Sequence, residues 1–278
     1  MDGRKLRVLY RHRAAMVGLG LLVLIMLLAG VVQGLSPHDP SEMKAGHQEQ
    51  GPTSSHWFGT DNSGRDVFTR LWVGARVSLL IGVASVLFSM AVGIPLGAVA
   101  GYAGGAVDMV LSRLVDLLLS FPSILLAICI AAALGTGMKT VIIAVGIVGV
   151  PQFARQVRAS VLQLKELDYV AASRALGASH ARVLFVDVLP NALGPMIVLA
   201  TLGIGTSILT AAGLSFLGLG VEPGTPEWGA MLHDGYGYWR RSSSLAIFSG
   251  LAISLTVLAF NLFGDGLRDA LDPRHDIK

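Results

Sequence analysis

The feature that most constrains this chain is a series of long apolar runs that contain no charged residue. Such runs cover residues 77–107, 117–138 and 188–221. A membrane-spanning helix needs about 20 mainly apolar residues, because its backbone has to cross a hydrocarbon layer about 30 Å thick. The runs, with shorter ones elsewhere, predict an all-α integral membrane protein. Its six transmembrane helices are expected at residues 14–35, 77–101, 109–134, 140–158, 188–212 and 244–265.

The composition supports this class and excludes several others. Hydrophobic residues make up 53% of the 278 residues, charged residues make up 14%, and the mean hydropathy is +0.65. A soluble domain carries about 25% charged residues. The composition therefore excludes a disordered chain, a nucleic-acid-binding domain and an ordinary soluble enzyme. The single cysteine, Cys129, excludes an intrachain disulfide and a zinc site built from cysteines.

The positive charges predict how the chain is oriented in the membrane. With six spans, 14 of the 21 Lys and Arg residues fall on one side and seven on the other. Because cytoplasmic segments carry the excess of Lys and Arg, the tails 1–13 and 266–278 are both expected in the cytoplasm. The first apolar run could instead be a secretory signal peptide. It is, however, longer than the usual core of about 7–15 residues and lacks a clear A-x-A cleavage site.

Three segments between the predicted spans are long enough to matter, and one of them is an outer loop over 222–241 that is rich in Gly, Pro and aromatic residues. Residues 36–76 would form an outer loop, and the apolar spacing in 66–80 predicts a helix lying on the membrane surface before the second span. Residues 159–187 would form an inner loop, which carries the basic residues Lys165, Arg174 and Arg182.

The inner loop has the pattern of two short helices. Asp168 can cap a first helix over 169–176, and Gly177 suits a left-handed stop after it. Ser179 can cap a second helix that leads into Pro190. One face of the first helix carries small residues, which favours docking into a groove of a partner protein over insertion into lipid. An ordinary connecting loop is the alternative interpretation.

Four blocks of sequence resemble a known family over nearly the whole chain. They are residues 169–177 (YVAASRALG) with 189–191, 56–66 (HWFGTDNSGRD) with 74–78, 214–221 (LSFLGLGV) with 227–231, and 261–273 (NLFGDGLRDALDP). The first block resembles the EAA loop of binding-protein-dependent ABC importer permeases. Together the blocks resemble the dipeptide/oligopeptide/nickel permease subfamily, of the second-subunit type.

The chain departs from the family pattern at four positions. Ala171 stands where the EAA loop has its glutamate, and Ser173 stands where it has its last alanine. Asp187 and Pro151 stand where the subfamily often has His and Trp. The first departure puts in doubt a salt bridge from that glutamate to a partner ATPase.

The resemblance implies a type I ABC importer permease fold with a cytoplasmic coupling helix in the loop 159–187, within a transmembrane core over 77–265. It implies a lipid-embedded complex in the bacterial inner membrane with a second homologous permease, two ATPase subunits and an external binding protein. The chain itself would then not be an enzyme, because the ATPases hydrolyse ATP. The residues expected to couple to the ATPases are Asp168, Tyr169, Ala171, Ala172, Ser173, Arg174, Leu176, Gly177, Ser179, Arg182 and Pro190.

Two further groups of residues have predicted structural roles. Gly93, Gly97 and Gly101 recur every four residues, a pattern that lets membrane helices pack closely. Asp108, Arg113 and Asp116 lie near the start of the third predicted span. Charges near lipid need partners, so these three residues are expected to form ion pairs at the cytoplasmic end, with a gate as the alternative.

The predicted function is import of dipeptides or oligopeptides as the permease subunit of an ATP-driven importer, with nickel or a nickel chelate as the alternative cargo. An autonomous secondary transporter or channel is the rival class. It is disfavoured because the middles of the spans lack the acidic residues that ion coupling uses. No catalytic or phosphate-binding motif is present. His47 and His56 share the outer loop, but nothing in the sequence fixes a metal geometry, so neither a metal nor a cofactor is predicted.

Overall fold

The computed structural model describes residues 9–10 and 12–271, with only the backbone described at positions 33 and 35. This part of the chain is helical and contains no β-strand. Its elements are α2 (Arg13–Leu35), α3 (Val67–Ala103), α4 (Gly105–Leu119), α5 (Ser123–Leu134), α6 (Met138–Leu164), α7 (Asp168–Ala175), α8 (His180–Arg182), the π-helical η1 (Val183–Val188), α9 (Leu189–Phe216), α10 (Trp228–Gly237) and α11 (Ser244–Leu271).

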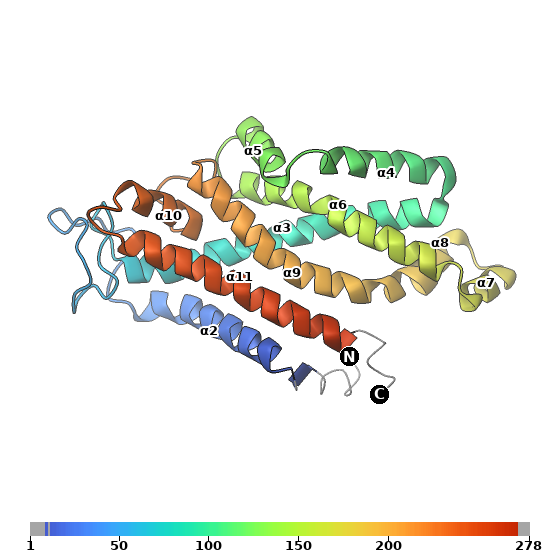
Figure 1. Cartoon of the computed structure of the whole chain (residues 1–278), viewed down its shortest axis with the longest axis horizontal. Helices are drawn as coiled ribbons and strands as arrows, with labels where there is room; N and C mark the ends of the chain where they lie inside the picture. The colour runs from blue at the N-terminus through green and yellow to red at the C-terminus, as the bar shows by residue number, and fades with distance from the viewer. Residues whose placement is uncertain (1–8, 11, 272–278) are drawn as a thin grey trace.

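The long helices form an elongated bundle with two distinct ends (Figure 1). The loop 36–66 and α10 lie at one end, called here the α10 end, and α7 and α8 lie at the other, called the α7 end. Helix α2 begins, and helix α11 finishes, on the side of the α7 end. Much of the predicted tails 1–13 and 266–278 lies outside the described residues.

The third predicted span, residues 109–134, is not one continuous helix in the structure. Helices α4 and α5 are separate and bent by 90° from one another. Pro122 lies in the break, and a proline removes a backbone donor and disfavours helical geometry at the residue before it. Helices α4 and α5 together nevertheless connect the α7 end of the bundle to the α10 end. The carbonyl of Gly101 accepts a hydrogen bond from Lys165 at the α7 end, whereas the Gly137 amide donates to Gly220 at the other end.

The helix predicted to lie on the membrane surface over 66–80 is not a separate element. It is the first part of α3, which runs unbroken for 37 residues, or roughly 55 Å at the usual rise. The Asp66 carboxylate caps its start by accepting from the Thr69 amide at 2.8 Å. Gly74 lies within this helix and does not interrupt it. The lack of a side chain there leaves room for the backbone of Pro226. Helix α3 therefore extends beyond the membrane-crossing length at the α10 end.

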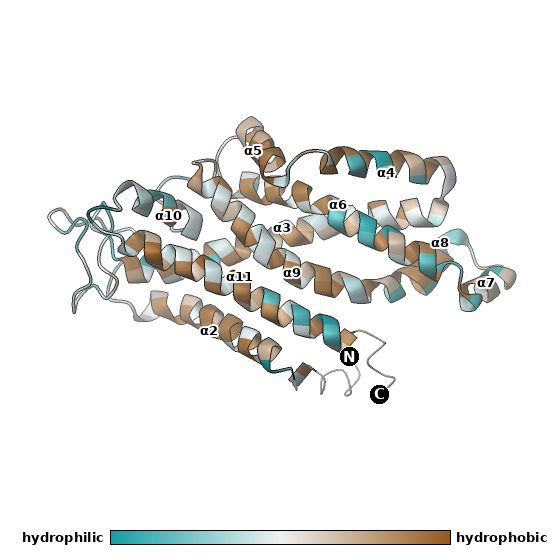
Figure 2. Cartoon of the chain, in the orientation of Figure 1, coloured by the Kyte–Doolittle hydropathy of each residue, from teal (hydrophilic) through white to brown (hydrophobic). Residues whose placement is uncertain are grey.

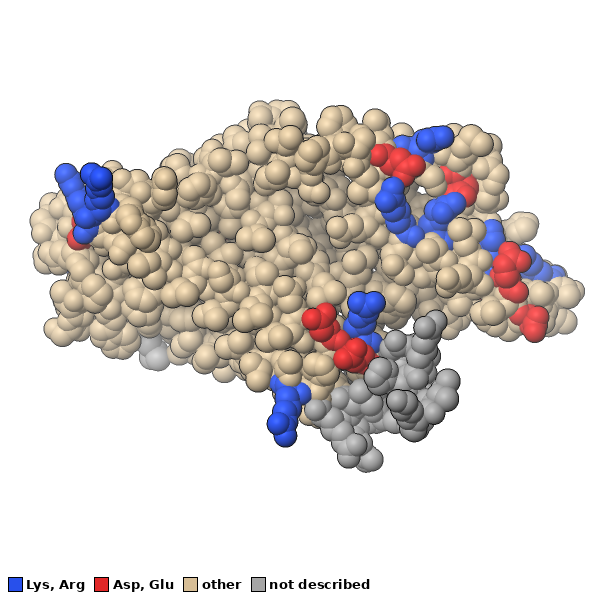
Figure 3. All heavy atoms as spheres, in the orientation of Figure 1, with Lys and Arg blue, Asp and Glu red and all other residues tan. Residues whose placement is uncertain are grey.

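The surface of the bundle fits a protein embedded in lipid. Figure 2 shows hydrophobic residues along the outer faces of α2, α5 and α11, with hydrophilic residues near the ends. On the face seen in Figure 3, the charged side chains gather toward the ends and leave an uncharged belt between them. Five helices of the described part are long and apolar enough to cross a membrane, and six if α4 and α5 count as one broken span.

The contact between α3 and α6 is the most extensive contact between helices in the described part of the bundle. Gly93, Gly97 and Gly101 lie along it, against the backbone of α6. A Cβ built on Gly101 would lie 2.9 Å from the Arg158 carbonyl oxygen, and one on Gly97 would overlap the carbonyl oxygen of Ala154. The two helices pack closely only because these positions carry no side chain.

Candidate functional site

The short helix α7 lies at the tip of the bundle, between α6 and η1. The prediction that Asp168 caps it is wrong, because Leu167 occupies the N-cap and Asp168 is the first helical residue. Its carboxylate still lies in the first turn, where the helix dipole favours negative charge. Gly177 has φ +84°, the left-handed conformation predicted for it. Ser179 accepts a hydrogen bond from the Arg182 amide and so caps α8, also as predicted.

A single apolar residue attaches α7 to the body of the protein. Val170 is fully buried against the apolar residues of α6 and η1. The other residues of the helix are exposed except for the partly buried Ser173, and Leu176, at its C-terminal end, is 89% exposed. A large apolar side chain so exposed at the α7 end is free to contact another protein.

Polar contacts hold α7 to the start of α9 through Asp187. The Ser173 hydroxyl donates to Asp187 Oδ2 at 2.7 Å, and the Tyr169 hydroxyl donates to the Asp187 carbonyl at 3.2 Å. The Asn191 amide also donates to that carbonyl, at 2.7 Å. Asp187 belongs to the π-helical segment η1, a form often found at functional sites. These contacts connect α7 to the start of the long helix α9.

A second link joins the same tip to the end of α3. The Tyr102 hydroxyl lies 3.1 Å from His180 Nδ1, and the guanidinium of Arg174 lies 5.6 Å from the centre of the Tyr102 ring. Arg174 thus has a cation–π contact within its own chain. The Arg182 side chain makes no ion pair among the residues that the structure describes. No sequence pattern pointed to Tyr102, because one tyrosine at the end of an apolar helix is common.

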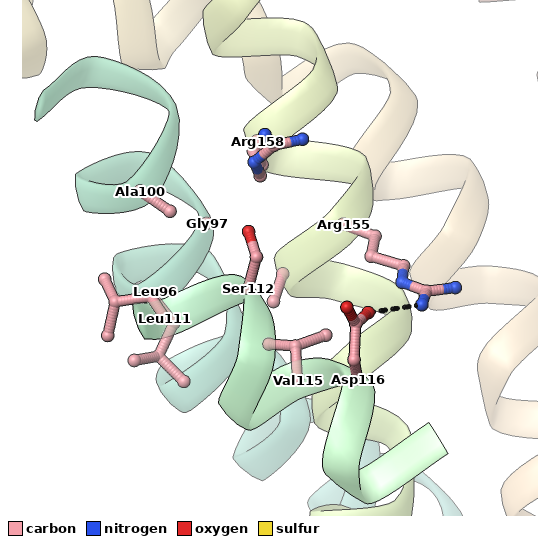
Figure 4. Close-up of a pocket in the computed structure, with 10 residues that line it drawn as sticks. Leu96, Gly97, Ala100, Leu111, Ser112, Val115, Asp116, Arg155 and Arg158 are labelled. Carbon is pink, nitrogen blue, oxygen red and sulfur yellow. Dashed lines mark hydrogen bonds and ion pairs between the residues drawn. The ribbon is translucent and has the colours of Figure 1, made fainter. Parts of the chain in front are cut away.

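A cavity of about 460 Å³ lies next to this tip, between α3, α4 and α6. Figure 4 shows Ser112, Val115 and Asp116 of α4 facing Arg155 and Arg158 of α6. The Asp116 carboxylate pairs with Arg155 at 2.7 Å. Asp108 forms a two-pronged pair with Arg158, at 2.6 and 2.7 Å.

Asp108, Arg113 and Asp116 were predicted to form ion pairs. The prediction is right about the two aspartates and wrong about Arg113 as their basic partner. Arg113 points away on the exposed face of α4 and makes no ion pair in the described part of the chain. The partners of the two aspartates lie on α6, because α4 packs along that helix. These pairs fasten the thinly packed α4 to the helix that leads into α7.

We expect Asp108→Asn to destabilise the protein more than Asp116→Asn. The Asp108–Arg158 pair has two charge-assisted hydrogen bonds, whereas both side chains of the Asp116–Arg155 pair are about half exposed. The expected losses are about 1 kcal/mol for Asp108→Asn and less than about 0.5 kcal/mol for Asp116→Asn. Thermal unfolding in detergent measures both, and a double-mutant cycle with Arg158→Gln separates the pair from other effects. Equal losses for both variants would contradict this assignment.

The α10 end is also cross-linked by buried polar groups. Glu227 caps α10 by accepting from the amides of Gly229 and Ala230, and it accepts from Ser78 of α3 at 3.1 Å. Arg70 of α3 is buried and donates to the carbonyls of Pro40 and Gly224. In α10, burial raises the pKa of the Asp234 carboxyl, against the opposing effect of Arg65 and Arg70. The loop 36–66 and the loop before α10 are thus fixed to α3.

Comparison with known proteins identifies the family of this multi-pass helical bundle. The chain belongs to the binding-protein-dependent transport system inner membrane components, the ABC importer permeases, whose family model matches residues 93–277. The model of the N-terminal transmembrane domain of oligopeptide transport permease C matches residues 4–52.

Two relatives are similar over almost the whole chain. The chain is 46% identical over 266 residues to the dipeptide transport system permease protein DppC of Alkalihalophilus pseudofirmus, covering 96% of this chain and 88% of the relative. It is 47% identical over 269 residues to the glutathione transport system permease protein GsiD of Pectobacterium atrosepticum, covering 96% and 89%.

Solved structures support the fold. An inward-facing structure of the MetNI methionine ABC transporter has a TM-score of 0.61 and 22% identity, covering 73% of this chain and 96% of that one. An amino acid ABC transporter has a TM-score of 0.54 and 15% identity, with 72% and 94% coverage. The type I ABC importer permease fold predicted from the sequence is confirmed.

Proposed function

We propose that this chain is the permease subunit of an ATP-driven importer of short peptides. The observation that carries the proposal is similarity at 46–47% identity, over 96% of the chain, to permeases named for dipeptide and glutathione transport. Both named cargoes are short peptides with charged ends. The complex would include a second homologous permease, two ATPase subunits and an external substrate-binding protein. The α7 end would face the cytoplasm with both chain termini, and the complex would lie in the bacterial inner membrane.

In this proposal α7 is the coupling helix that receives movement from an ATPase. Three observations support this role. The helix is exposed, Val170 is its single apolar anchor, and polar contacts link this end of the bundle to α9 and α3. Closure of the ATPases would push α7 as a rigid body. Asp187 would pass the push to α9, and the Tyr102 link would pass it to α3. The exposed Leu176 and the charge of Arg182 are the groups placed to contact the ATPase.

Two departures from the family pattern contact one another between α7 and η1. Ser173 stands at a position that is usually alanine, Asp187 at one that is often histidine, and their side chains share a 2.7 Å hydrogen bond. A hydrogen bond to a charged group contributes roughly 1.5–3 kcal/mol. This bond would hold α7 in place without the EAA glutamate, whose position Ala171 occupies.

We expect Ser173→Ala and Asp187→Ala each to loosen α7 without dissociating the complex. Loss of the bond should speed hydrogen exchange of the α7 amides by about tenfold and lower the transport achieved per ATP hydrolysed. The double variant should be no worse than Asp187→Ala alone. Thr201→Ala is the control, because that hydroxyl bonds only within its own helix, to Ile197. Unchanged exchange in both single variants would refute the link.

The test of the function is reconstitution of the complex purified through a tag on this chain. Partners are identified by mass, and the complex is placed in liposomes with its binding protein. Labelled dipeptide, glutathione and Ni²⁺ are then offered with and without ATP. Uptake of dipeptide or glutathione that requires ATP and the binding protein supports the proposal. Uptake of Ni²⁺ alone would show that nickel is the cargo. Uptake without ATP would favour a channel or secondary transporter over an ATP-driven importer.

A further inference from the structure

The loop between α2 and α3 brings two histidines and an aspartate together at the α10 end. These residues are His38, just after α2, His56 within the loop, and Asp66, the cap of α3. One potential ligand atom from each lies within 4.8 Å of the others. The sequence paired His56 with His47, but those rings meet edge-on at 6.5 Å, whereas His38 stacks on His56 at 4.6 Å.

The hydrogen bonds around these three residues leave Asp66 Oδ1 and His38 Nδ1 available to bind a metal ion. Asp66 Oδ2 is occupied by the amide and hydroxyl of Thr69, so Oδ1 faces His56 Nδ1 at 2.8 Å. His38 Nε2 lies 3.0 Å from the Ser55 carbonyl oxygen. A carbonyl only accepts, so this nitrogen carries the proton and Nδ1 keeps a lone pair. Metal-binding histidines have this arrangement, in which the second ring nitrogen donates to a carbonyl or carboxylate.

The surroundings also suit a cation. His56 and Asp66 are buried, and His38 is half-buried. His38 and Asp66 lie on the wall of a cavity of about 510 Å³, whose other walls are mostly apolar, including Val31 and Trp57. The cavity gives an ion a route to the ligands, and its apolar walls strengthen the attraction of a carboxylate for a cation.

We propose that His38, His56 and Asp66 bind a divalent transition-metal ion of the zinc type. Two imidazoles and one carboxylate are a ligand set that Zn²⁺ takes, with water in the fourth position toward the cavity. The ion takes the place of the proton on His56 Nδ1, and that proton moves to Nε2 of the same ring. The ion ties the end of α2 to the start of α3 and so fixes the loop 36–66. This site goes beyond the proposed transport function and does not depend on the cargo.

His38 is the residue that distinguishes a metal site from a structural hydrogen bond. A buried His56–Asp66 pair by itself would stabilise the loop, so replacing either residue would also disturb the fold. His38 is partly exposed, and its removal leaves both the His56–Asp66 bond and the cap of α3 in place. The His38→Ala variant therefore tests the ion without unfolding the loop.

The experiment is calorimetric titration of ZnCl₂ into the purified complex, after removal of any histidine tag and treatment with chelator. The wild type should bind one Zn²⁺ per copy of this chain, and His38→Ala should weaken that binding by at least about tenfold. His233→Ala is the matched control and should bind as the wild type does. That histidine lies at the same end but bonds to the Phe216 carbonyl, outside the cluster. Equal affinity in the wild type and His38→Ala, or no saturable binding by the wild type, would overturn the proposal.

Discussion

Replacing Gly97 with alanine is expected to destabilise the protein strongly, although alanine is the better helix former. The added Cβ would overlap the carbonyl oxygen of Ala154 on α6 and approach the Arg158 amide to 3.0 Å. Both are backbone atoms, so relief requires α3 and α6 to move apart. Overpacking of this kind costs about 1–3 kcal/mol or more, and here we expect the upper end of that range. The measurement is the thermal unfolding midpoint in detergent, with the yield of monodisperse complex.

Gly20→Ala is the matched control for this substitution. Gly20 lies in a predicted membrane span, α2, and a Cβ built there meets no atom within 4 Å. Alanine is favoured over glycine in a helix by up to about 1 kcal/mol, so this variant should keep or slightly raise the midpoint. If Gly97→Ala unfolded at the wild-type temperature, the close packing of α3 on α6 would be disproved.

Replacing Gly177 with aspartate is expected to release the ATPase subunits from the complex. Gly177 has φ +84° and is exposed, so the substitution strains the turn and adds a negative charge beside α7. Left-handed backbone costs a non-glycine residue roughly 1–2 kcal/mol. Because about 1.4 kcal/mol changes a binding constant tenfold, recovery of ATPases with the tagged chain should fall by at least about that factor. Transport should fall with it.

Gly218→Asp provides a control with the same local chemistry at the opposite end. Gly218 has φ +79°, is exposed and, like Gly177, has no atom within 4 Å of a built Cβ. The two variants therefore carry the same backbone strain and the same added charge. Retention of the ATPases by Gly218→Asp, with their loss from Gly177→Asp, would locate the docking site at the α7 end. Loss from both variants, or from neither, would contradict the assignment of α7.

The class of protein and most of its helices could be predicted from the sequence because membrane insertion leaves a strong local signal. A run of about 20 uncharged apolar residues has few alternatives to a spanning helix. The turn at Gly177 and the cap at Ser179 were also predictable, since each depends on one residue and its immediate neighbours. The Asp168 cap was wrong by one position, within the normal uncertainty of helix ends.

The break between α4 and α5 could not be predicted from its proline alone. Pro95, Pro151 and Pro195 lie inside α3, α6 and α9, and those helices continue through them. Whether a helix bends or breaks at a proline depends on the neighbours that satisfy the freed backbone groups. The same limit applies to the ion pairs, because Asp108 and its partner Arg158 are 50 residues apart in the chain.

From the order of amino acids alone we could predict a chain that crosses a membrane repeatedly, has a short helix near residue 170 and resembles an ABC importer permease. These properties follow from local composition and short motifs. Which side chains meet is visible only in the folded bundle: Ser173 with Asp187, Asp108 with Arg158, and His38 with His56 and Asp66. The physical reason is that these contacts join segments from different helices and loops. Their distances depend on how the whole bundle packs, and no single run of residues carries that information.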